Sequence, residues 1–376
     1  MSFSVQDSQF MAEALQLAAQ GIYTTTPNPN VGALIVKNGQ IIGRGYHRQA
    51  GGPHAEVFAL REAGKQAAGA TCYVTLEPCS HYGRTPPCAE ALIRAGVKRV
   101  VIASLDPNPL VSGNGVAMLQ AAGIQVDSGL LATQARALNK GFLSRMERKR
   151  PYVRLKMAAS LDGRTALANG KSQWLTGAAA RADVQHYRAQ SCAVLSTAAT
   201  VLADNARLTV RPEQLLQQVT PVDNGQIRQP KRIILDRRRL LTGSEALFDS
   251  TSDIILCYAG SEHRKLENNA VFPNITRQIS CALSGQQFDL AALMQQLAQQ
   301  EQLNQLWVEA GAVLAGALLQ ARLVDELIVY IAPKLLGQHG LPLAVLPQFT
   351  ELTETLSLQW QDIRQVGDDL RLTAIL

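Results

Sequence analysis

Three potential zinc ligands, His54, Cys79 and Cys88, most constrain how this chain can fold, because one ion would require all three in one place. Imidazole and thiolate groups suit Zn²⁺, and three protein ligands leave the fourth tetrahedral position open for water. Each cysteine directly follows a proline, and Glu56 stands two residues after the histidine. This glutamate is not needed as a ligand, so it is free to move protons at the open position.

The ordered set matches the H-x-E…P-C…C signature of hydrolytic deaminases that act on nucleobase-like rings. Zinc lowers the pKa of a bound water from about 15.7 to roughly 7. We expect Glu56 to take a proton from that water and to deliver it to the ring nitrogen and the departing amine. A lone cysteine is usually a small buried hydrophobic residue, so only the complete set favours zinc. The alternative is a closed structural zinc site with His81 or Cys72 as fourth ligand, which would leave Glu56 without a role.

Eight residues separate the two cysteines, whereas the usual short form of the signature has two. This stretch, residues 80–87, is polar and contains one glycine and two prolines, so it is predicted to be a loop. We expect the loop to lie over the metal and to supply Ser80, His81 and Arg84 to a polar or anionic substrate.

The length of 376 residues favours two domains, and 47% apolar with 18% charged residues is typical of globular proteins. No apolar stretch of about 18 residues predicts a membrane span, and no secretory signal is visible at the N-terminus. Six cysteines in so long a chain do not resemble a disulfide framework. We therefore expect a cytoplasmic protein that has no membrane partner.

The net charge of +6 raises the question of a nucleic-acid partner. Residues 1–150 contain 15 Lys or Arg against 9 Asp or Glu, whereas residues 151–376 contain 21 of each. Half of the excess lies in residues 145–150, which are predicted to form a solvated linker; a weak field for an anionic substrate is the alternative. No aromatic residues alternate with a basic stripe, so nucleic acid is not the expected partner.

Alternating strands and helices predict a three-layer α/β domain for the first part of the chain. Apolar spacing predicts a helix over residues 7–20 with Asp7 as its cap, and Lys37-Asn-Gly39 is typical of a hairpin turn. Helix 56–63 is expected to begin at His54, and helix 88–95 to carry Cys88. The remaining elements are expected at 31–36, 40–45, 72–76, 99–103, 116–122 and 125–128.

Charge concentrates just before Pro151, which places a boundary there and gives domains at 1–148 and 149–376. The second domain is also predicted to be α/β and to end in strands. Its strands are expected at 152–159, 193–196, 231–235, 253–258, 306–309, 326–332 and 356–376. Its helices are expected at 178–189, with Thr176 as a candidate cap, and at 290–299 and 313–321. No complete G-x-G-x-x-G is present, so that motif gives no indication of a nicotinamide site.

Several runs closely resemble the bifunctional riboflavin-biosynthesis deaminase–reductase family. In the first half they are Thr26-Pro-Asn-Pro-Asn-Val-Gly32, His54-Ala-Glu56, Thr75-Leu-Glu-Pro-Cys-Ser-His-Tyr-Gly-Arg-Thr-Pro-Pro-Cys88 and Asp106-Pro-Asn-Pro109. In the second half they are Arg154-Leu-Lys-Met-Ala-Ala-Ser-Leu-Asp-Gly-Arg164, Ser172-Gln-Trp-Leu-Thr176, Thr200-Val-Leu-Ala-Asp204 and Val308-Glu-Ala-Gly311. The resemblance extends from about residue 7 to residue 376.

The resemblance implies a cytidine-deaminase-like zinc domain followed by a dihydrofolate-reductase-like α/β domain, with one Zn²⁺ per chain and NADPH as cofactors. The first domain would deaminate 2,5-diamino-6-(5-phosphoribosylamino)pyrimidin-4(3H)-one. The second would reduce the ribose of 5-amino-6-(5-phosphoribosylamino)uracil to a ribityl chain. A small-molecule substrate and a homo-oligomer, dimer or tetramer, are expected.

Position by position, the resemblance also implies the site residues. In the deaminase half the zinc ligands are His54, Cys79 and Cys88, the proton shuttle is Glu56, and the substrate contacts are Asn28, His47, Arg84, Asp106 and Asn108. In the reductase half the substrate contacts are Lys156, Ser172, Arg188, Leu208, Arg211 and Glu309. The cofactor contacts there are Ala158, Trp174, Thr200, Asp204, Gly311, Ala312, Val313, Leu314, Ala315, Gly316 and Ala317.

The chemistry of these residues suits the implied ligands. Two arginines and a lysine suit a phosphorylated sugar, and Gly311 allows backbone N–H groups to approach the cofactor pyrophosphate at a helix start. Either Asp204 or Lys156 is a candidate acid for opening the ribose. One arginine of 237–239 could contact the 2′-phosphate of NADPH, with a solvated turn as the alternative.

Structural explanations remain for three of the residues. Asn28 could simply shape a turn, Asp106 could cap the proline-rich turn, and Trp174 could belong to the core. Two other functions compete with the favoured one. A nucleic-acid base deaminase, such as a tRNA adenosine editor with an appended binding module, would share the zinc chemistry, and a non-catalytic zinc-stabilised scaffold would share the ligands.

Overall fold

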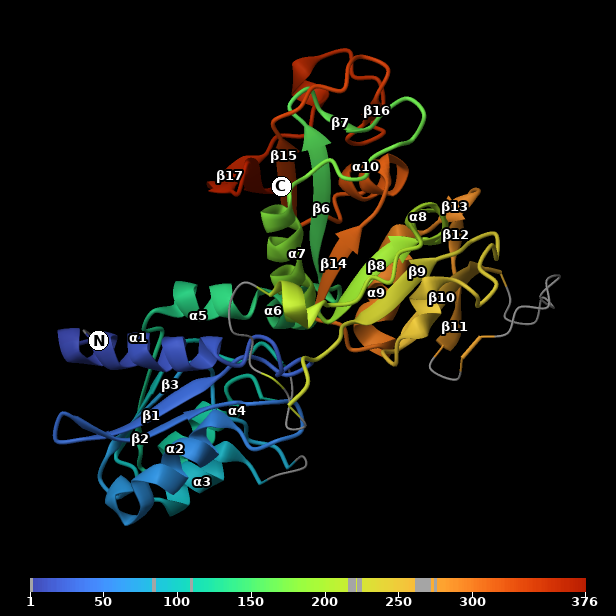
Figure 1. The fold of residues 1–376 in the computed structure, drawn as a ribbon. Coiled ribbons are helices and arrows are strands. Elements are labelled where there is room, and N and C mark those ends of the chain that lie inside the picture. The colour runs from blue at the N-terminus through green and yellow to red at the C-terminus, as the bar shows by residue number, and fades with distance from the viewer. Residues whose placement is uncertain are drawn as a thin grey trace. The chain divides into compact units, whose positions relative to one another are not determined.

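A mixed five-stranded sheet organises the first part of the chain in the computed structural model (Figure 1). The structure describes residues 3–82, 86–108, 111–215, 221, 225–260, 272–273 and 276–376. Within these residues, the sheet has the order β2-β1-β3-β4-β5, with β1 antiparallel to both neighbours and the last three strands parallel. The strands are β1 (Gly32–Lys37), β2 (Gln40–Tyr46), β3 (Thr71–Val74), β4 (Arg99–Ile102) and β5 (Gln125–Ser128).

Helices cover both faces of this sheet, which gives the three layers expected from the sequence (Figure 1). Successive residues of β1 face opposite sides. Ala33 and Ile35 pack in the cluster with α2, α3 and α4, whereas Leu34 and Val36 pack in the cluster with α1 and α5. The helices are α1 (Val5–Ala19), α2 (Ala55–Ala63), α3 (Cys88–Arg94), α4 (Asn114–Ala121), α5 (Ala132–Leu138) and α6 (Lys140–Arg148).

Two glycines of β2 let α2 lie directly against the sheet. A Cβ atom on Gly45 would stand 2.1 Å from the backbone oxygen of Ala55, and one on Gly43 would stand 2.1 Å from that of Ala59. Any side chain at these positions would push the helix outward. The close approach therefore fixes the start of α2, where His54 is the N-cap residue.

A larger sheet organises the second part of the chain (Figure 1). Across the described residues it has nine strands in the order β11-β10-β9-β8-β14-β6-β15-β18-β17. The strands from β11 to β15 are parallel, and β18 and β17 add an antiparallel hairpin at one edge. The bounds are β6 (Tyr152–Ser160), β8 (Ala193–Thr197), β9 (Lys231–Leu235), β10 (Ile254–Ala259), β11 (Thr276–Cys281), β14 (Gln305–Glu309), β15 (Glu326–Ala332), β17 (Gln359–Val366) and β18 (Asp369–Ile375).

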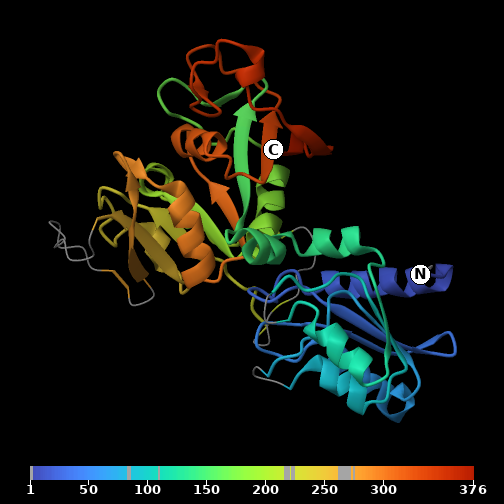
Figure 2. The same ribbon diagram turned by 180° about the vertical axis from the view of Figure 1, so that it is seen from behind.

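Two pairs of helices sandwich this sheet. Residues of α9 (Leu290–Gln300) and α10 (Ala312–Gln320) pack with Leu155 and Val308 in one core cluster. Residues of α7 (Ala178–Gln190) and α8 (Ala198–Asp204) pack with Trp307 in the other. Figure 2 shows α9 in front of the sheet. Short elements complete this part: β7 (Arg164–Ala166), β12 (Leu283–Ser284), β13 (Gln287–Phe288) and β16 (Leu341–Pro342).

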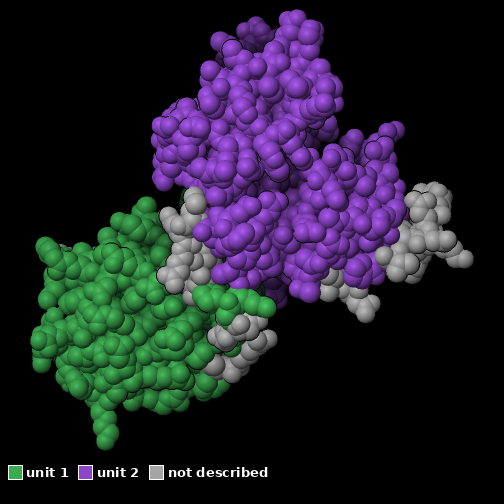
Figure 3. Space-filling view, viewed as in Figure 1, with its two compact units in different colours: residues 1–149, 220–226 green, residues 150–219, 227–376 purple. Residues whose placement is uncertain are grey.

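The chain divides into two compact units, residues 1–149 with 220–226 and residues 150–219 with 227–376 (Figure 3). The 3-10 turns are Gly64–Ala67 in the first unit and Pro212–Gln214, Ala246–Asp249 and Leu352–Glu354 in the second. None of the helices in the described ranges has the length and apolar character that crossing a membrane requires.

The predicted alternation of strands and helices is confirmed, but three local predictions are wrong. Ser4, not Asp7, caps α1, and Asp7 is its partner in a capping box. Gly177, not Thr176, is the N-cap of α7. The predicted solvated linker begins within a helix, because α6 extends to Arg148 and buries its apolar side against Leu76. Glu147 and Arg148 lie on the exposed face of that helix, whereas Arg150 beyond it forms an ion pair with Asp325 at 2.7 Å.

Candidate active sites

The first unit brings the three predicted zinc ligands together. His54 Nδ1 lies 3.6 Å from Cys79 Sγ and 3.3 Å from Cys88 Sγ, and the three ligand atoms all lie within 4.8 Å of one another. His54 caps α2, Cys88 begins α3, and Cys79 follows β3 after a short loop. The ends of two helices and one strand thus converge on one point.

These distances fit a zinc ion. Bonds of about 2.3 Å to sulfur and about 2.05 Å to nitrogen at a tetrahedral angle place the two ligand atoms about 3.6 Å apart. Neither His81 nor Cys72 belongs to the cluster among the described residues. A set of three ligands suits an open site better than the closed structural site that the sequence left as an alternative.

Glu56 lies in the first turn of α2 and is 3% exposed. Its Oε2 atom is buried and makes no hydrogen bond within the described residues. Burial raises the pKa of this carboxyl, and His54 opposes that effect. A buried carboxylate oxygen without a partner is costly unless it has a ligand to bind, so this atom indicates a functional site rather than a structural one.

The predicted substrate contacts Asn28 and His47 lie beside the ligand cluster. The His47 ring packs edge-on against that of His54 with centroids 5.4 Å apart. His47 Nδ1 lies 3.0 Å from the Pro53 carbonyl, which can only accept, so Nδ1 donates. Burial lowers the pKa of His47, so the ring is neutral and its Nε2 accepts from Asn28 Nδ2 at 3.0 Å. This chain of bonds fixes the orientation of the Asn28 amide.

Asp106 and Asn108 are joined through a tight turn, in which Asn108 N–H donates to Asp106 Oδ1 at 2.8 Å. Burial raises the pKa of Asp106 to about 6, and Glu77 and Cys79 add to this effect through their charges. Asp106 is thus electrostatically linked to the ligand cluster. Arg84, predicted to contact the substrate, lies outside the described residues.

In the second unit, Arg188 and Glu309 form a buried bidentate ion pair. Arg188 Nε and Nη2 donate to the two Glu309 oxygens at 2.6 and 2.9 Å, and Trp307 Nε1 donates to Oε1 at 2.8 Å. Burial would raise the pKa of Glu309, but Arg188, followed by Lys156, outweighs it and lowers the pKa to about 2. Lys156 pairs with Glu309 across the β6–β14 register. Burial lowers the pKa of the Lys156 ammonium, while Glu309 opposes that effect.

A segment with two predicted contacts, Ser172 and Trp174, follows β7. Trp174 is 61% exposed, so the alternative that it belongs to the core is wrong. Lys334 Nζ donates to the carbonyls of Trp174 and Leu175 at 3.0 and 2.8 Å. The guanidinium of Arg181 lies 4.6 Å from the centroid of the Trp174 ring system. The segment is held through its backbone while the indole stays accessible.

The predicted cofactor residues 311–317 form the beginning of α10. Gly311 is the N-cap, no side chain caps the helix, and a Cβ atom there would meet nothing within 4 Å. This leaves room for an anion at the first backbone N–H groups. Leu314 and Ala315 pack in the core instead, and Val313 is 70% exposed.

The remaining predicted contacts lie on the same unit. Thr200 lies in the first turn of α8, and its N–H donates to the side chain of Thr197, the N-cap. Asp204 ends α8 and accepts from Gln173 Nε2 at 3.3 Å. Leu208 is buried, and the Arg211 N–H donates to Gln185 Oε1 at 3.0 Å. Ala158 lies on β6 two residues beyond Lys156.

The three arginines after β9 separate into two kinds. Arg239 lies with its guanidinium 3.9 Å from the ring centroid of Tyr258, so it is engaged in a cation–π contact. Arg238 is exposed.

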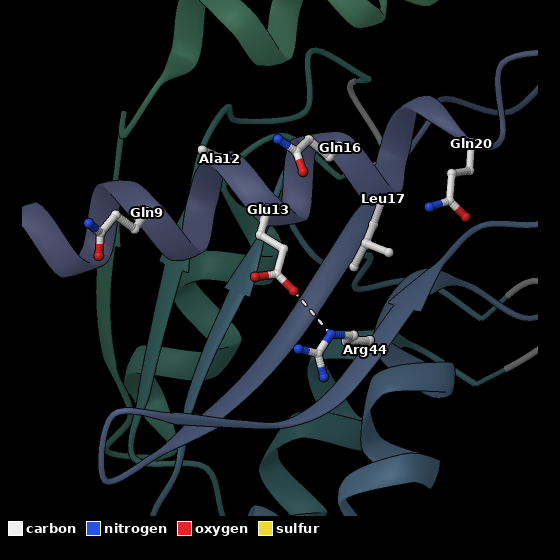
Figure 4. A pocket seen from close by; sticks show the side chains of 7 residues that line it. All are labelled: Gln9, Ala12, Glu13, Gln16, Leu17, Gln20 and Arg44. Atoms are coloured by element: carbon white, nitrogen blue, oxygen red, sulfur yellow. Dashed lines mark hydrogen bonds and ion pairs between the residues drawn. The ribbon is translucent and has the colours of Figure 1, made fainter.

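One hollow of about 500 Å³ lies on α1 (Figure 4). It is lined by Gln9, Ala12, Glu13, Gln16, Leu17, Gln20 and Arg44. An ion pair of 3.0 Å between Glu13 and Arg44 crosses it. It contains none of the predicted site residues, so it is separate from both candidate active sites.

Sequence reasoning missed two polar residues that organise the sites. Glu77 is buried between β3 and Cys79, and its carboxylate accepts hydrogen bonds from backbone N–H groups of a distant segment. Lys334 was also missed. An acidic residue next to a candidate ligand was a signal for Glu77, whereas nothing local indicated the partner of Lys334.

Family models match both parts of the chain. The cytidine and deoxycytidylate deaminase zinc-binding region matches residues 4–104, and the RibD C-terminal domain matches residues 151–372. The first match covers all three candidate zinc ligands and Glu56. The two matches confirm the expected order of a cytidine-deaminase-like domain followed by a reductase domain.

Close relatives cover nearly the whole chain. The riboflavin biosynthesis protein RibD of Escherichia coli (strain K12) is 52% identical over 98% of this chain and 99% of its own length. The solved structure of Acinetobacter baumannii RibD, form 1, has a TM-score of 0.89 at 47% identity and covers 98% of both chains. A Thermotoga maritima deaminase and reductase has a TM-score of 0.83 at 33% identity with the same coverage. The chain therefore belongs to the RibD family of bifunctional riboflavin-biosynthesis enzymes, in which one polypeptide contains a deaminase and a reductase.

Proposed function

We propose that this enzyme deaminates 2,5-diamino-6-(5-phosphoribosylamino)pyrimidin-4(3H)-one and then reduces the ribose of 5-amino-6-(5-phosphoribosylamino)uracil with NADPH. The solved Thermotoga maritima relative is described as a deaminase and reductase for these compounds. The observation that carries the proposal is the open three-ligand cluster beside the unpartnered buried oxygen of Glu56. We assign the deaminase to residues 1–148, with one zinc ion per chain, and the reductase to residues 149–376.

His54, Cys79 and Cys88 would hold the zinc ion in the deaminase. When bound, zinc acts as a Lewis acid that makes water a nucleophile near neutral pH. Glu56 would transfer two protons from the attacking water in turn, the first to the ring nitrogen and the second, from the resulting hydroxyl group, to the departing amine, so that water enters and ammonia leaves. The raised pKa of Glu56 suits a group that must both accept and donate.

Asn28 and Asp106 would orient the pyrimidine. The amide of Asn28 is held by the neutral ring of His47, so it presents a fixed hydrogen-bonding edge. Asp106, with a pKa of about 6, offers a carboxyl group to an amino or ring N–H group. Asn108 and Arg84 would complete the contacts, with Arg84 toward the phosphate end.

In the reductase, bound NADPH would supply the hydride that reduces C1′ of the ribose. Lys156 would deliver the proton that the ring oxygen needs as the C1′–O4′ bond breaks, since burial lowers the pKa of its ammonium. Arg188 holds Glu309 ionised next to Lys156. The charge of Glu309 favours the protonated form of Lys156 and so opposes the effect of burial. Ser172, Leu208 and Arg211 would line the sugar-phosphate site.

The cofactor would bind along residues 311–317, with Ala158, Trp174, Thr200 and Asp204 nearby. The uncapped start of α10 and the open space at Gly311 support a phosphate at this point. The exposed indole of Trp174 supports a contact with a flat ring of the cofactor.

We further propose a cytoplasmic homo-oligomer, dimer or tetramer, that acts on a small molecule and not on nucleic acid. Zinc ligation by Cys79 and Cys88 requires reduced thiols, which suits a reducing compartment. The edge strand β17 exposes Trp360 and Ile363, each 57% exposed, as an apolar surface for another copy. Light scattering of the purified chain tests the oligomer.

The test of the proposed function compares wild type with Glu56→Gln in one assay of ammonia release and NADPH oxidation. Wild type should release ammonia from the diaminopyrimidinone and then oxidise NADPH. The variant should keep its zinc, lose ammonia release by about 100-fold or more, and oxidise NADPH only when given the deaminated compound. Ammonia release that persists in Glu56→Gln, or NADPH that is never oxidised, would contradict the proposal.

A further inference from the structure

One buried carboxylate joins the two halves of the deaminase site. Glu77 is 4% exposed and lies between β3 and the ligand Cys79. Its Oε2 accepts from the N–H groups of Asp106 and Gly113 at 3.2 and 3.1 Å. Its Oε1 accepts from those of Gly115 and Val116 at 3.0 and 3.2 Å. Four backbone donors thus satisfy both oxygens of one side chain.

The four donors belong to a segment about 30 to 40 residues away along the chain. This segment begins at Asp106, a proposed substrate contact, and ends in the first turn of α4. Glu77 also contacts the chain just before this segment, because its N–H donates to the Ser104 carbonyl at 3.0 Å. A Cβ atom on Gly115 would lie 2.1 Å from the Pro78 carbonyl, so only glycine permits the approach.

We propose that Glu77 is a positioning residue of the deaminase: it fixes the substrate-contacting turn at Asp106 relative to the metal ligand Cys79. This inference rests on the proposed deaminase function. Glu77 acts through the backbone N–H groups of Asp106 and of the start of α4, and it takes no part in the proton transfers assigned to Glu56. Oε2 joins the turn at Asp106 to Gly113, the N-cap of α4, and Oε1 holds the first turn of that helix.

The substitution Glu77→Gln tests this role with little change of shape. The amide keeps one accepting oxygen, but its NH₂ group faces two backbone N–H donors that it cannot accept from. At least one pair of N–H groups is then buried without a partner, and the segment must shift to recover them. A shift of about 1 Å in a substrate-positioning group can lower kcat/KM about 100-fold.

We expect Glu77→Gln to bind one zinc ion per chain and to lower deaminase kcat/KM about 100-fold, mostly through a higher KM. Reductase activity on the deaminated compound, measured in the same protein, should stay within about twofold of wild type. Gly115→Ala, which forces the same segments apart without changing a charge, should also raise KM. The control Asp127→Asn removes another buried carboxylate of the same unit, bonded to Arg99 and Gln125, and should leave KM unchanged.

The outcomes separate the inference from the proposed function. A wild type that releases no ammonia in the presence of zinc refutes the proposed function itself. An active wild type with Glu77→Gln at wild-type KM refutes the positioning role. Loss of zinc in Glu77→Gln, or a fall in kcat per bound zinc at constant KM, also refutes it, because Glu77 would then support the metal site and not the substrate turn.

Discussion

Neutralising Glu309 should destabilise the second unit by about 3 kcal/mol at pH 7. The surroundings of Glu309 lower its pKa from 4.5 to about 2, chiefly because Arg188 outweighs the cost of burial. Each pKa unit is worth about 1.4 kcal/mol, so this stabilisation amounts to roughly 3 kcal/mol. Glu309→Gln removes it and leaves Arg188 without its ion-pair partner, in line with the roughly 3–5 kcal/mol that breaking a buried ion pair costs.

The effect has a defined pH dependence. A carboxyl whose folded pKa is lowered contributes its stabilisation above the unfolded pKa, here about 4.5, and loses it as the pH falls toward about 2. The difference between wild type and Glu309→Gln should therefore be constant from pH 7 down to about pH 5. It should shrink as the pH is lowered further.

Tryptophan fluorescence in urea measures this transition selectively. The three tryptophans, Trp174, Trp307 and Trp360, all lie in the second unit, so the signal reports only its unfolding. The control Asp249→Asn breaks an ion pair with Arg207 whose side chains are 57% and 60% exposed, and it should change stability by less than about 0.5 kcal/mol. A change below about 1 kcal/mol in Glu309→Gln at pH 7, or a difference that does not shrink at pH 3.5, would refute the reasoning.

Three further predictions concern single contacts. Asp7→Asn should destabilise the first unit by about 2 kcal/mol at pH 7, which hydrogen exchange of α1 measures. Hydrogen bonds lower the pKa of Asp7 despite its burial, so the difference between wild type and variant should shrink as the pH falls below about 4. Gly316→Ala should cost the second unit about 1–3 kcal/mol in urea unfolding, since a Cβ atom would lie 1.9 Å from the Val345 carbonyl. Lys334→Ala should raise the KM for NADPH about threefold or more in steady-state assays while kcat changes less, because Trp174 loses a backbone anchor. An unchanged KM would contradict this role of Lys334.

The sequence alone was sufficient for the deaminase chemistry. The residue types His54, Glu56, Cys79 and Cys88 in that order imply a zinc ion with an open position, because ligand chemistry and spacing are properties of the chain itself. Most strands were also predictable, since buried parallel strands are short apolar runs that do not depend on their partners. Boundaries were less accurate where charge masked an amphipathic helix, as in α6.

Only the tertiary structure decided which polar groups meet. Glu309 and Arg188 are 121 residues apart in sequence, and Lys334 is 160 residues from Trp174. The strand order also inserts β14 between β8 and β6 and so brings Glu309 beside Lys156. The same holds for Glu77, whose four donors come from one distant turn and helix start. A sequence records the ligands and the apolar periodicity of each segment, whereas the partners of a buried charge are set by how those segments pack.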